Sequence, residues 1–287
     1  MLQQIRCKVF PLKYLVYFIS GSILIASITI IAEKKSPKIA GILMSLPVIT
    51  FLSLVFMAMS QGVDFASKAA LWNPIGAVAD LVYMGFFAAG IKIPEYLDTR
   101  RKMKYIHYSG INEKIKEIFC GLITGFAGYF VSILVLSKFS ISSGWVSLFF
   151  LWIAAIISYK IFRRFPDIKN IPQKIVSSKD ILFRCLFGGS AVAAIVILGD
   201  SAGYLWGGLF SSFPGTITPV IVLLHLKNGK EMSYSVIKSS PIGLSATGLY
   251  SSMVWLLYPS VGIIIGTLAS YTAVLGFLSV IKRTVNF

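Results

Sequence analysis

The sequence has few charged residues and few of the side chains that enzymes use most often. Of its 287 residues, 13% are charged, 11 are acidic, two are histidine and three are cysteine. Cys7, Cys120 and Cys185 have no paired spacing, and His107 and His225 stand alone, so we expect neither a disulfide framework nor a metal site. No paired-carboxylate or Ser-His-Asp motif is present in the sequence. We therefore predict a protein that is not an enzyme and has no cofactor.

Hydrophobic residues, in contrast, make up 56% of the chain, more than one soluble core of this size buries. They form continuous runs of roughly 18 to 25 residues, the length that a helix needs to cross about 30 Å of hydrocarbon. We predict an all-α polytopic protein of the cell membrane, in contact with the lipid bilayer. It has about nine transmembrane helices, at residues 14–32, 38–60, 69–91, 119–137, 143–161, 181–199, 204–226, 236–258 and 260–281.

The basic residues predict the orientation of these helices. The net charge is +16, but the Lys and Arg side chains lie mainly between the predicted spans, so we expect no nucleic-acid partner. The loops alternate between two sides, and 22 of the 27 Lys and Arg fall on one of them. By the positive-inside rule that side, with the C-terminus, is cytoplasmic. Nine spans place the N-terminus outside, and Arg6, Lys8 and Lys13 are the evidence against this assignment.

The sequence contains an internal repeat. A shift of 167 residues lays residues 15–87 over residues 182–254 without a gap. Glycine and proline constrain the backbone more than other residues do, so their shared spacing predicts a shared chain path. The coinciding pairs are Gly21 with Gly188, Gly41 with Gly208, Pro47 with Pro214, Gly62 with Gly229, Pro74 with Pro241, and Gly76 with Gly243.

The two copies should have opposite orientations in the membrane. We predict a first four-helix unit at residues 14–137, a linker helix and basic cytoplasmic loop at 138–180, and a second four-helix unit at 181–287. One helix between the units inverts the second unit, which gives an inverted 4+1+4 repeat. Charge supports the inversion, because loop 33–38 has three lysines and its mate at 200–205 has only Asp200.

Prolines lie within the predicted spans at matched positions of the two copies. A proline inside a helix removes one backbone hydrogen bond and clashes with the preceding turn, so we predict a helix break or kink at each. One interpretation is that these are packing kinks, which are common in membrane helices. The other is that broken helices from the two copies meet near the midplane and form a binding site. The residues are Pro47, Pro74, Pro214 and Pro241.

Polar and small residues share one face of the third predicted span, and the same pattern recurs in the eighth. An unpaired polar group in hydrocarbon costs roughly 2–7 kcal/mol, so both faces should point toward each other or toward a cavity. We predict that they bind a small-molecule or ion substrate. The residues are Asn73, Gly76, Asp80 and Tyr83 in the first copy, and Ser240, Gly243, Thr247 and Tyr250 in the second.

Asp80 is the only acidic residue well inside a predicted span. An ionised carboxylate at that depth costs roughly 2.5–3.5 kcal/mol, so it should be paired, hydrated or protonated. A structural role, with hydrogen bonds to hydroxyl groups, is one interpretation. The other is that Asp80 couples transport to protons or to another cation.

The chain also resembles a family, the small four-span GlpM-type membrane proteins of bacteria, whose biochemical activity is not established. The resemblance rests on Ala40-Gly41-Ile42, Leu46-Pro47 and Gly62, and on Gly207-Gly208-Leu209, Phe213-Pro214 and Gly229. It implies that each half of the chain corresponds to one such protein, fused in opposite orientations. Leu46 departs from the Phe that precedes the proline in the family, and the linker helix has no counterpart there.

These observations favour a secondary transporter or permease for a small solute or lipid-like molecule, with its site between the two halves near the membrane midplane. A non-transporting scaffold or assembly partner is the first alternative. A membrane-embedded enzyme is the second, although the sequence lacks a recognisable catalytic set. Neither the substrate nor the oligomeric state is evident from the sequence.

Overall fold

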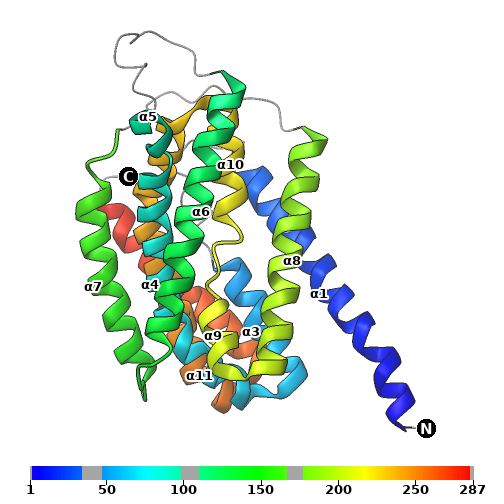
Figure 1. The fold of residues 1–287 in the computed structure, drawn as a ribbon. Coiled ribbons are helices and arrows are strands. Elements are labelled where there is room, and N and C mark those ends of the chain that lie inside the picture. The colour runs from blue at the N-terminus through cyan, green and yellow to red at the C-terminus, as the bar shows by residue number, and fades with distance from the viewer. Residues whose placement is uncertain (1, 34–46, 98–109, 167–176, 285–287) are drawn as a thin grey trace.

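The computed structural model describes residues 2–33, 47–97, 110–166 and 177–284, and in these ranges every regular element is a helix. Figure 1 shows the helices gathered into one bundle, with α1 extending from it toward the N-terminus. Their bounds are α1 Leu2–Glu33, α3 Val48–Gln61, α4 Val63–Gly90, α5 Ile93–Leu97, α6 Ile111–Leu136, α7 Gly144–Phe162, α8 Ser178–Ala202, α9 Tyr204–Phe210, α10 Ile217–Asn228 and α11 Lys230–Thr284.

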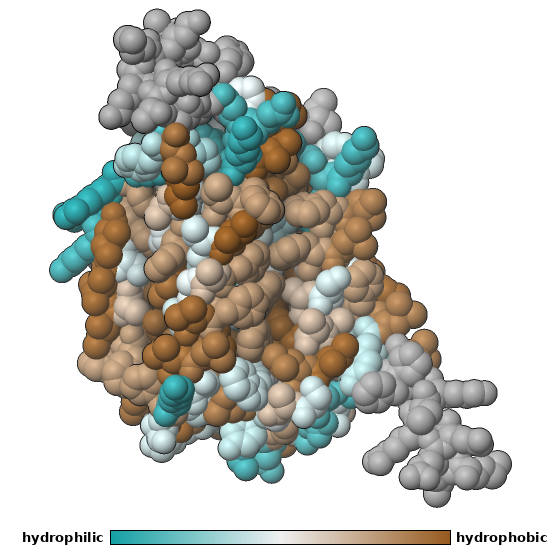
Figure 2. All heavy atoms as spheres, viewed as in Figure 1, coloured by the Kyte–Doolittle hydropathy of each residue, from teal (hydrophilic) through white to brown (hydrophobic). Residues whose placement is uncertain are grey.

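The prediction of a helical, multi-pass membrane protein is supported by the length and composition of these helices. Five segments are long and apolar enough to cross a membrane: Val63–Leu97, Ile111–Leu136, Gly144–Phe162, Ser178–Ala202 and Lys230–Ile281. The outer faces of α6 and α7 carry exposed Phe, Ile, Val and Trp side chains. Figure 2 shows this hydrophobic surface across the middle of the molecule, with hydrophilic residues at both ends.

Several helices differ in extent from the predicted spans. α1 is 32 residues long, about 48 Å at 1.5 Å per residue, so its N-terminal part exceeds one bilayer core of about 30 Å. The run at 204–226 is divided into α9 and α10. In the run at 38–60, only α3 and Pro47 lie within the described residues. The last two predicted spans are two arms of α11, joined at Gly262, which has φ 77° and ψ −177°.

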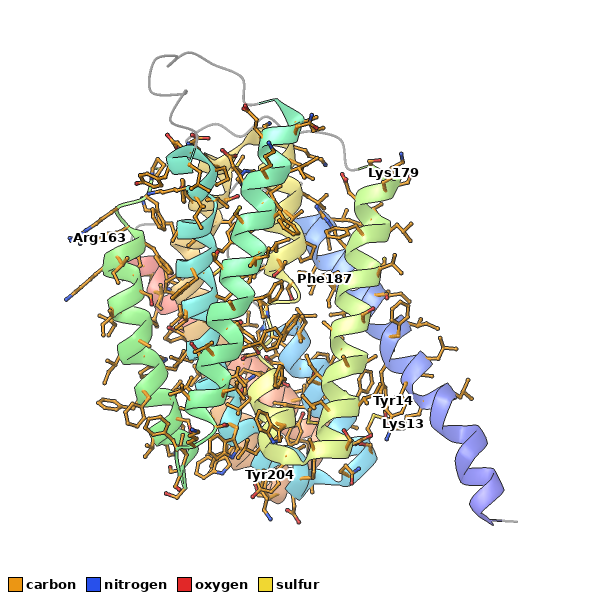
Figure 3. All side chains as sticks on the ribbon, viewed as in Figure 1. Lys13, Tyr14, Arg163, Lys179, Phe187 and Tyr204 are labelled. Carbon is orange, nitrogen blue, oxygen red and sulfur yellow. The ribbon has the colours of Figure 1, made fainter. Side chains whose placement is uncertain are left out.

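α6 runs from the upper to the lower end of the view, α7 returns to the upper end and α8 runs down again (Figure 1). α1 begins at the lower end of the view and α8 at the upper end, so these two contacting helices are antiparallel. α4 rises through the middle, where it contacts α3, α6, α7, α9 and α11. Arg163 and Lys179 lie toward the upper end and Tyr204 at the lower end (Figure 3).

Three of the helix connections in the described residues consist of a single glycine, and one of them is Gly203, which joins α8 to α9 with φ 96° and ψ 172°. Gly62 joins α3 to α4 with φ 97° and ψ 163°, and Gly229 joins α10 to α11 with φ 89° and ψ −177°. This backbone conformation is open to glycine and strained for other residues. The N–H of Gly62 donates to Ala58 O at 2.9 Å and that of Gly229 to His225 O at 2.8 Å. The same short connection therefore occurs at two positions that the 167-residue shift pairs.

Pro74 and Pro241, where the sequence predicts a break or a kink, lie inside continuous helices, so neither proline ends a helix. A proline lacks the N–H that would bind the carbonyl four residues earlier, so that carbonyl needs another donor. Ser240 Oγ donates to Ile237 O at 2.8 Å, which supplies the donor that Pro241 lacks. The helix therefore continues through Pro241 with its freed carbonyl satisfied.

Candidate functional site

The chain is interrupted between α9 and α10, near Pro214. Residues 211–216 are not helical, and Pro214 has no backbone N–H to continue the ladder. Thr50 Oγ1 of α3 donates to the free carbonyl of Ser211 at 2.9 Å. Pro47 directly precedes α3, with φ −74° and ψ 57°. The predicted break at Pro214 is thus present, and the described part of the earlier span begins just after Pro47.

A cavity of about 70 Å³ lies where these two helix ends meet α4 and α11. Six of the predicted site and break residues line it: Pro47, Asp80, Pro214, Ser240, Gly243 and Thr247. Further lining residues come from the start of α3, from residues 211–217 and from the first arm of α11. The two polar faces predicted from the sequence therefore converge on a single space at Asp80, Ser240 and Thr247.

Asp80 is the charged residue of this cavity. Its exposed fraction is 3%, and its Oδ1 accepts no hydrogen bond from any residue that the structure describes. The described lining includes no Lys, Arg or His to balance its charge. A buried carboxylate without a charge partner is costly, and such groups in membrane proteins often mark ion or substrate sites.

Asn73 has a structural place behind the cavity and does not line it. Its Nδ2 donates to Ser211 Oγ at 2.7 Å and to Thr50 Oγ1 at 3.3 Å, and Ser251 Oγ donates to its Oδ1 at 2.5 Å. One fully buried amide thus links α3, α4, the broken segment and α11. It fixes the position of the helix ends that form the cavity wall.

Gly76 and Gly208 allow α4 and α9 to approach each other closely. A Cβ on Gly76 would lie 2.0 Å from Leu209 O, and a Cβ on Gly208 would lie 2.1 Å from Ala69 O. Neither contact leaves room for a side chain. The prediction that Gly76 makes room for a neighbouring backbone describes this contact, while its mate Gly243 lines the cavity.

The two tyrosines of the predicted site lie elsewhere. Tyr83 is fully buried, and its hydroxyl is 2.9 Å from Thr218 Oγ1 of α10. Tyr250 packs against Tyr271, with ring centroids 4.9 Å apart. Helical spacing places residues on one face of a helix. It does not show which neighbouring helix packs against each of those residues. The structure therefore divides the eight predicted residues among the cavity and the packing around it.

Phe213 fixes the broken segment from the side opposite α3. Its ring stacks on Phe126 at 5.8 Å and on Phe187 at 6.3 Å, and meets Tyr129 edge to face at 5.6 Å. Side chains from α6 and α8 therefore hold a residue that also lines the cavity. From the sequence, Phe213 is notable only as the residue before Pro214. Its role could not be predicted, because its aromatic partners in α6 and α8 are distant along the chain.

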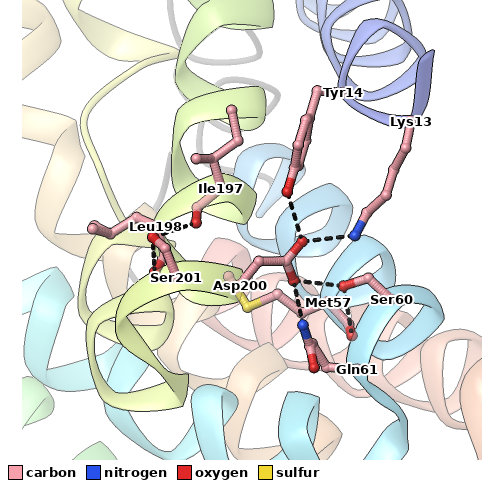
Figure 4. A network of polar contacts seen from close by, with 9 residues as sticks. All are labelled: Lys13, Tyr14, Met57, Ser60, Gln61, Ile197, Leu198, Asp200 and Ser201. Atoms are coloured by element: carbon pink, nitrogen blue, oxygen red, sulfur yellow. Dashed lines mark hydrogen bonds and ion pairs between the residues drawn. The ribbon is translucent and has the colours of Figure 1, made fainter. Parts of the chain in front are cut away.

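A second polar cluster, missed in the sequence, surrounds Asp200 at the lower end of α8 (Figure 4). Its Oδ2 accepts from Lys13 Nζ at 2.7 Å and from Tyr14 Oη at 3.2 Å, and its Oδ1 accepts from Ser60 Oγ at 2.8 Å and Gln61 Nε2 at 3.1 Å. These contacts join α1, α3 and α8. Lys13, one of the basic residues that conflict with an external N-terminus, is paired here.

A third cluster joins α6, α10 and α11 at the upper end. His225 Nε2 is 3.0 Å from Glu117 Oε2, and its Nδ1 is 2.9 Å from Ser233 Oγ. His225 and Ser233 are fully buried and Glu117 is 5% exposed. The set has the residue types of a hydrolase triad, but none of the three lines the cavity. In this conformation it links helices, and no substrate reaches the serine hydroxyl.

No group of three His, Cys, Asp or Glu side chains suited to a metal ion occurs in the described ranges. No family model matches the chain, and no curated protein or solved structure matches it either. The resemblance to GlpM-type proteins therefore stays a prediction.

Proposed function

We propose that the protein is a secondary transporter or permease for a small solute, and that the cavity at Asp80 is its binding site. The observation that carries this proposal is the meeting of two helix ends, at Pro47 and at residues 211–216, around a buried carboxylate whose Oδ1 has no partner among the described residues. Many transporters bind substrates and coupling ions where helices are interrupted near the midplane, because the free backbone groups there serve as ligands.

We propose with it that the chain is an inverted repeat of nine spans. Two contacts between α1 and α8 support this. A Cβ on Gly21 would lie 3.0 Å from Val192 Cβ, and a Cβ on Gly188 would lie 2.7 Å from Ile25 Cδ1. The shift of 167 residues exchanges Gly21 with Gly188 and Ile25 with Val192, so it converts one contact into the other. Such an exchange is expected of two copies related by a two-fold axis.

The proposed orientation has the upper end of Figure 1 in the cytoplasm. Lys92, Arg163, Lys179, Lys227 and Lys230 of the described residues belong to the loops that the sequence assigns to this side. At the opposite end, Lys13 is neutralised by Asp200. The remaining N-terminal cations, Arg6 and Lys8, belong to the first turns of α1 and stay the evidence against this orientation.

A scaffold protein is the alternative that the test must separate from a transporter. A scaffold gains nothing from a cavity with an unpaired carboxylate, because leaving a buried polar group without a partner costs stability. A transporter needs such a space, since the substrate must replace water at the site. An enzyme has no support from the cavity, whose described lining residues contain one acidic group and no histidine.

Alternating access provides a test that needs no knowledge of the substrate. Cys7, Cys120 and Cys185 are replaced by serine, and Ser212, a cavity residue that is 5% exposed, is replaced by cysteine. The protein is then placed in sealed vesicles of both orientations and treated with a membrane-impermeant thiol reagent. A transporter exposes its site to each side in turn, so we expect Ser212→Cys to be labelled in both kinds of vesicle.

Ser245→Cys serves as the matched control. Ser245 is 8% exposed, lies on the first arm of α11 and does not line the cavity, and its Oγ donates to Pro241 O at 2.8 Å. It should stay unlabelled from both sides. Labelling of Ser212→Cys from neither side, or from only one side under all conditions, would contradict the transporter and favour the scaffold.

A further inference from the structure

We propose that the cavity binds a small monovalent cation, either an alkali metal ion or an ammonium-type ion, with Asp80 as its charge partner. This inference rests on the proposed function, since it names the class of ion or substrate for the same site. It follows from the hydrogen bonds of the cavity wall, from its charge and from its size.

Six of the seven hydroxyl groups in the described wall donate their proton to a backbone carbonyl oxygen, and Thr216 is the exception. The six donate as follows: Thr50 to Ser211, Ser211 to Gly208, Ser212 to Leu209, Ser239 to Val236, Ser240 to Ile237 and Thr247 to Gly243. A hydroxyl group has one proton and two lone pairs. Once the proton is donated, the oxygen can only accept.

Two of these oxygens also accept a hydrogen bond, because Asn73 Nδ2 donates to Thr50 Oγ1 and to Ser211 Oγ. The oxygens of Ser239, Ser240 and Thr247 accept no hydrogen bond from any described residue. Apart from Thr216, the described side chains of the wall therefore present carboxylate and hydroxyl oxygens that accept. A metal ion or an N–H donor would find ligands among these oxygens.

The charge of the wall favours a monovalent ion. Asp80 is the only ionisable acidic residue in the described lining, and no basic residue accompanies it. Protein sites for divalent cations usually combine more than one carboxylate. One carboxylate balances one positive charge, and the bound ion would satisfy Asp80 Oδ1, which otherwise has no partner in the described chain.

The volume suits a small ligand in this conformation. A cavity of about 70 Å³ has room for an ion and a few water molecules, since each water needs roughly 10–15 Å³ on the same scale. It also has room for an ammonium or methylammonium ion. It does not enclose a whole lipid-like molecule, one of the two substrate classes considered from the sequence.

The test measures the unfolding temperature of the purified full-length protein in detergent as a function of cation concentration. The probes are Na⁺, K⁺, Li⁺, ammonium and methylammonium chlorides, each balanced with the bulky cation N-methylglucamine at constant ionic strength. A ligand that binds the folded state raises its unfolding temperature in a saturable way. We expect at least one small cation to do so in the wild-type protein.

Two cavity variants and one matched control define the site. Asp80→Asn removes the charge, and we expect the apparent affinity to fall by about tenfold or more. Thr247→Val removes one acceptor oxygen with little change of shape, and should weaken binding by about threefold to tenfold. Asp64→Asn makes the same change as the first variant at an exposed position on the same helix, and should leave the affinity unchanged.

The pattern of stabilisation identifies the source of the cation. Saturable stabilisation by alkali ions supports a co-transported metal ion, and stabilisation by ammonium and methylammonium supports an amine substrate. Equal effects of all salts, including N-methylglucamine, or an unchanged affinity in both Asp80→Asn and Thr247→Val, would overturn the cation site.

These outcomes are separate from those of the transport proposal. Labelling of Ser212→Cys from both sides without any specific cation effect refutes the cation site and leaves the transporter standing. Specific cation binding that depends on Asp80, without access from both sides, supports the ion site and refutes transport through it.

Discussion

Replacement of Gly76 by alanine tests the close packing on which the cavity wall depends. The added Cβ would lie 2.0 Å from Leu209 O and 2.5 Å from Ser212 Oγ. A carbon and an oxygen in contact are normally about 3.3–3.6 Å apart. α9 would therefore have to recede by more than 1 Å, and its contact through Gly208 with Ala69 would loosen at the same time.

The expected cost follows from two opposing terms. Overpacking of a tight interior costs typically about 1–3 kcal/mol, and a backbone obstacle places this site near the upper value. Alanine gains about 1 kcal/mol over glycine in helix propensity. The net loss is about 2 kcal/mol, which corresponds to a fall in unfolding temperature on the order of 4–8 °C for a chain of this size.

Gly85 on the same helix provides the matched control. A Cβ there would lie 3.8 Å from the nearest Phe162 ring atom, an ordinary contact. Gly85→Ala should be neutral or slightly stabilising, because it gains helix propensity without a clash. Both variants are compared by thermal unfolding in the same detergent. If Gly76→Ala unfolds at the same temperature as Gly85→Ala, the close approach of α4 and α9 is wrong.

Two further predictions concern the ends of the bundle. Asp200→Asn replaces a carboxylate that accepts four hydrogen bonds, and should lower the free energy of unfolding by about 1.5–3 kcal/mol. Asp64→Asn at an exposed site should lower it by less than about 0.5 kcal/mol. Equal losses in denaturation experiments would show that the Asp200 cluster is not formed. Single cysteines at Gln61 and Asn228 in the cysteine-free background should react differently with a membrane-impermeant thiol reagent. Gln61→Cys should react in intact cells, and Asn228→Cys only after permeabilisation. Equal reaction of both variants in intact cells would exclude the inverted repeat.

The sequence predicts the helices of this protein better than the contacts between them. Apolar runs are set by the thickness of the bilayer, so α6, α7 and α8 lie within a few residues of α-helical spans at 119–137, 143–161 and 181–199, apart from an earlier start of α6. Pro214 was correctly expected at an interruption, because a missing N–H acts locally.

Features that depend on partners from distant segments were not predictable. At Pro241 the helix α11 continues, and the freed carbonyl of Ile237 accepts a hydrogen bond from the Ser240 hydroxyl. The sequence does not show which rotamer Ser240 adopts, so this hydrogen bond could not be predicted. Glu117 and His225 are 108 residues apart, and no spacing rule relates them. Tyr83 and Asp80 share one helix face, yet α10 covers the tyrosine at Thr218 while the aspartate meets the cavity.

The glycine connections also constrain how the chain enters a membrane during synthesis. At Gly229 the helix α10 ends and α11 begins with no residues between them except the glycine, so the two cannot be released into lipid as independent segments with a free linker. Lys227 and Lys230 flank this turn and resist passage through hydrocarbon. In the proposed orientation, α10 and the first arm of α11 would therefore enter the membrane as one hairpin, with its tip on the cytoplasmic side.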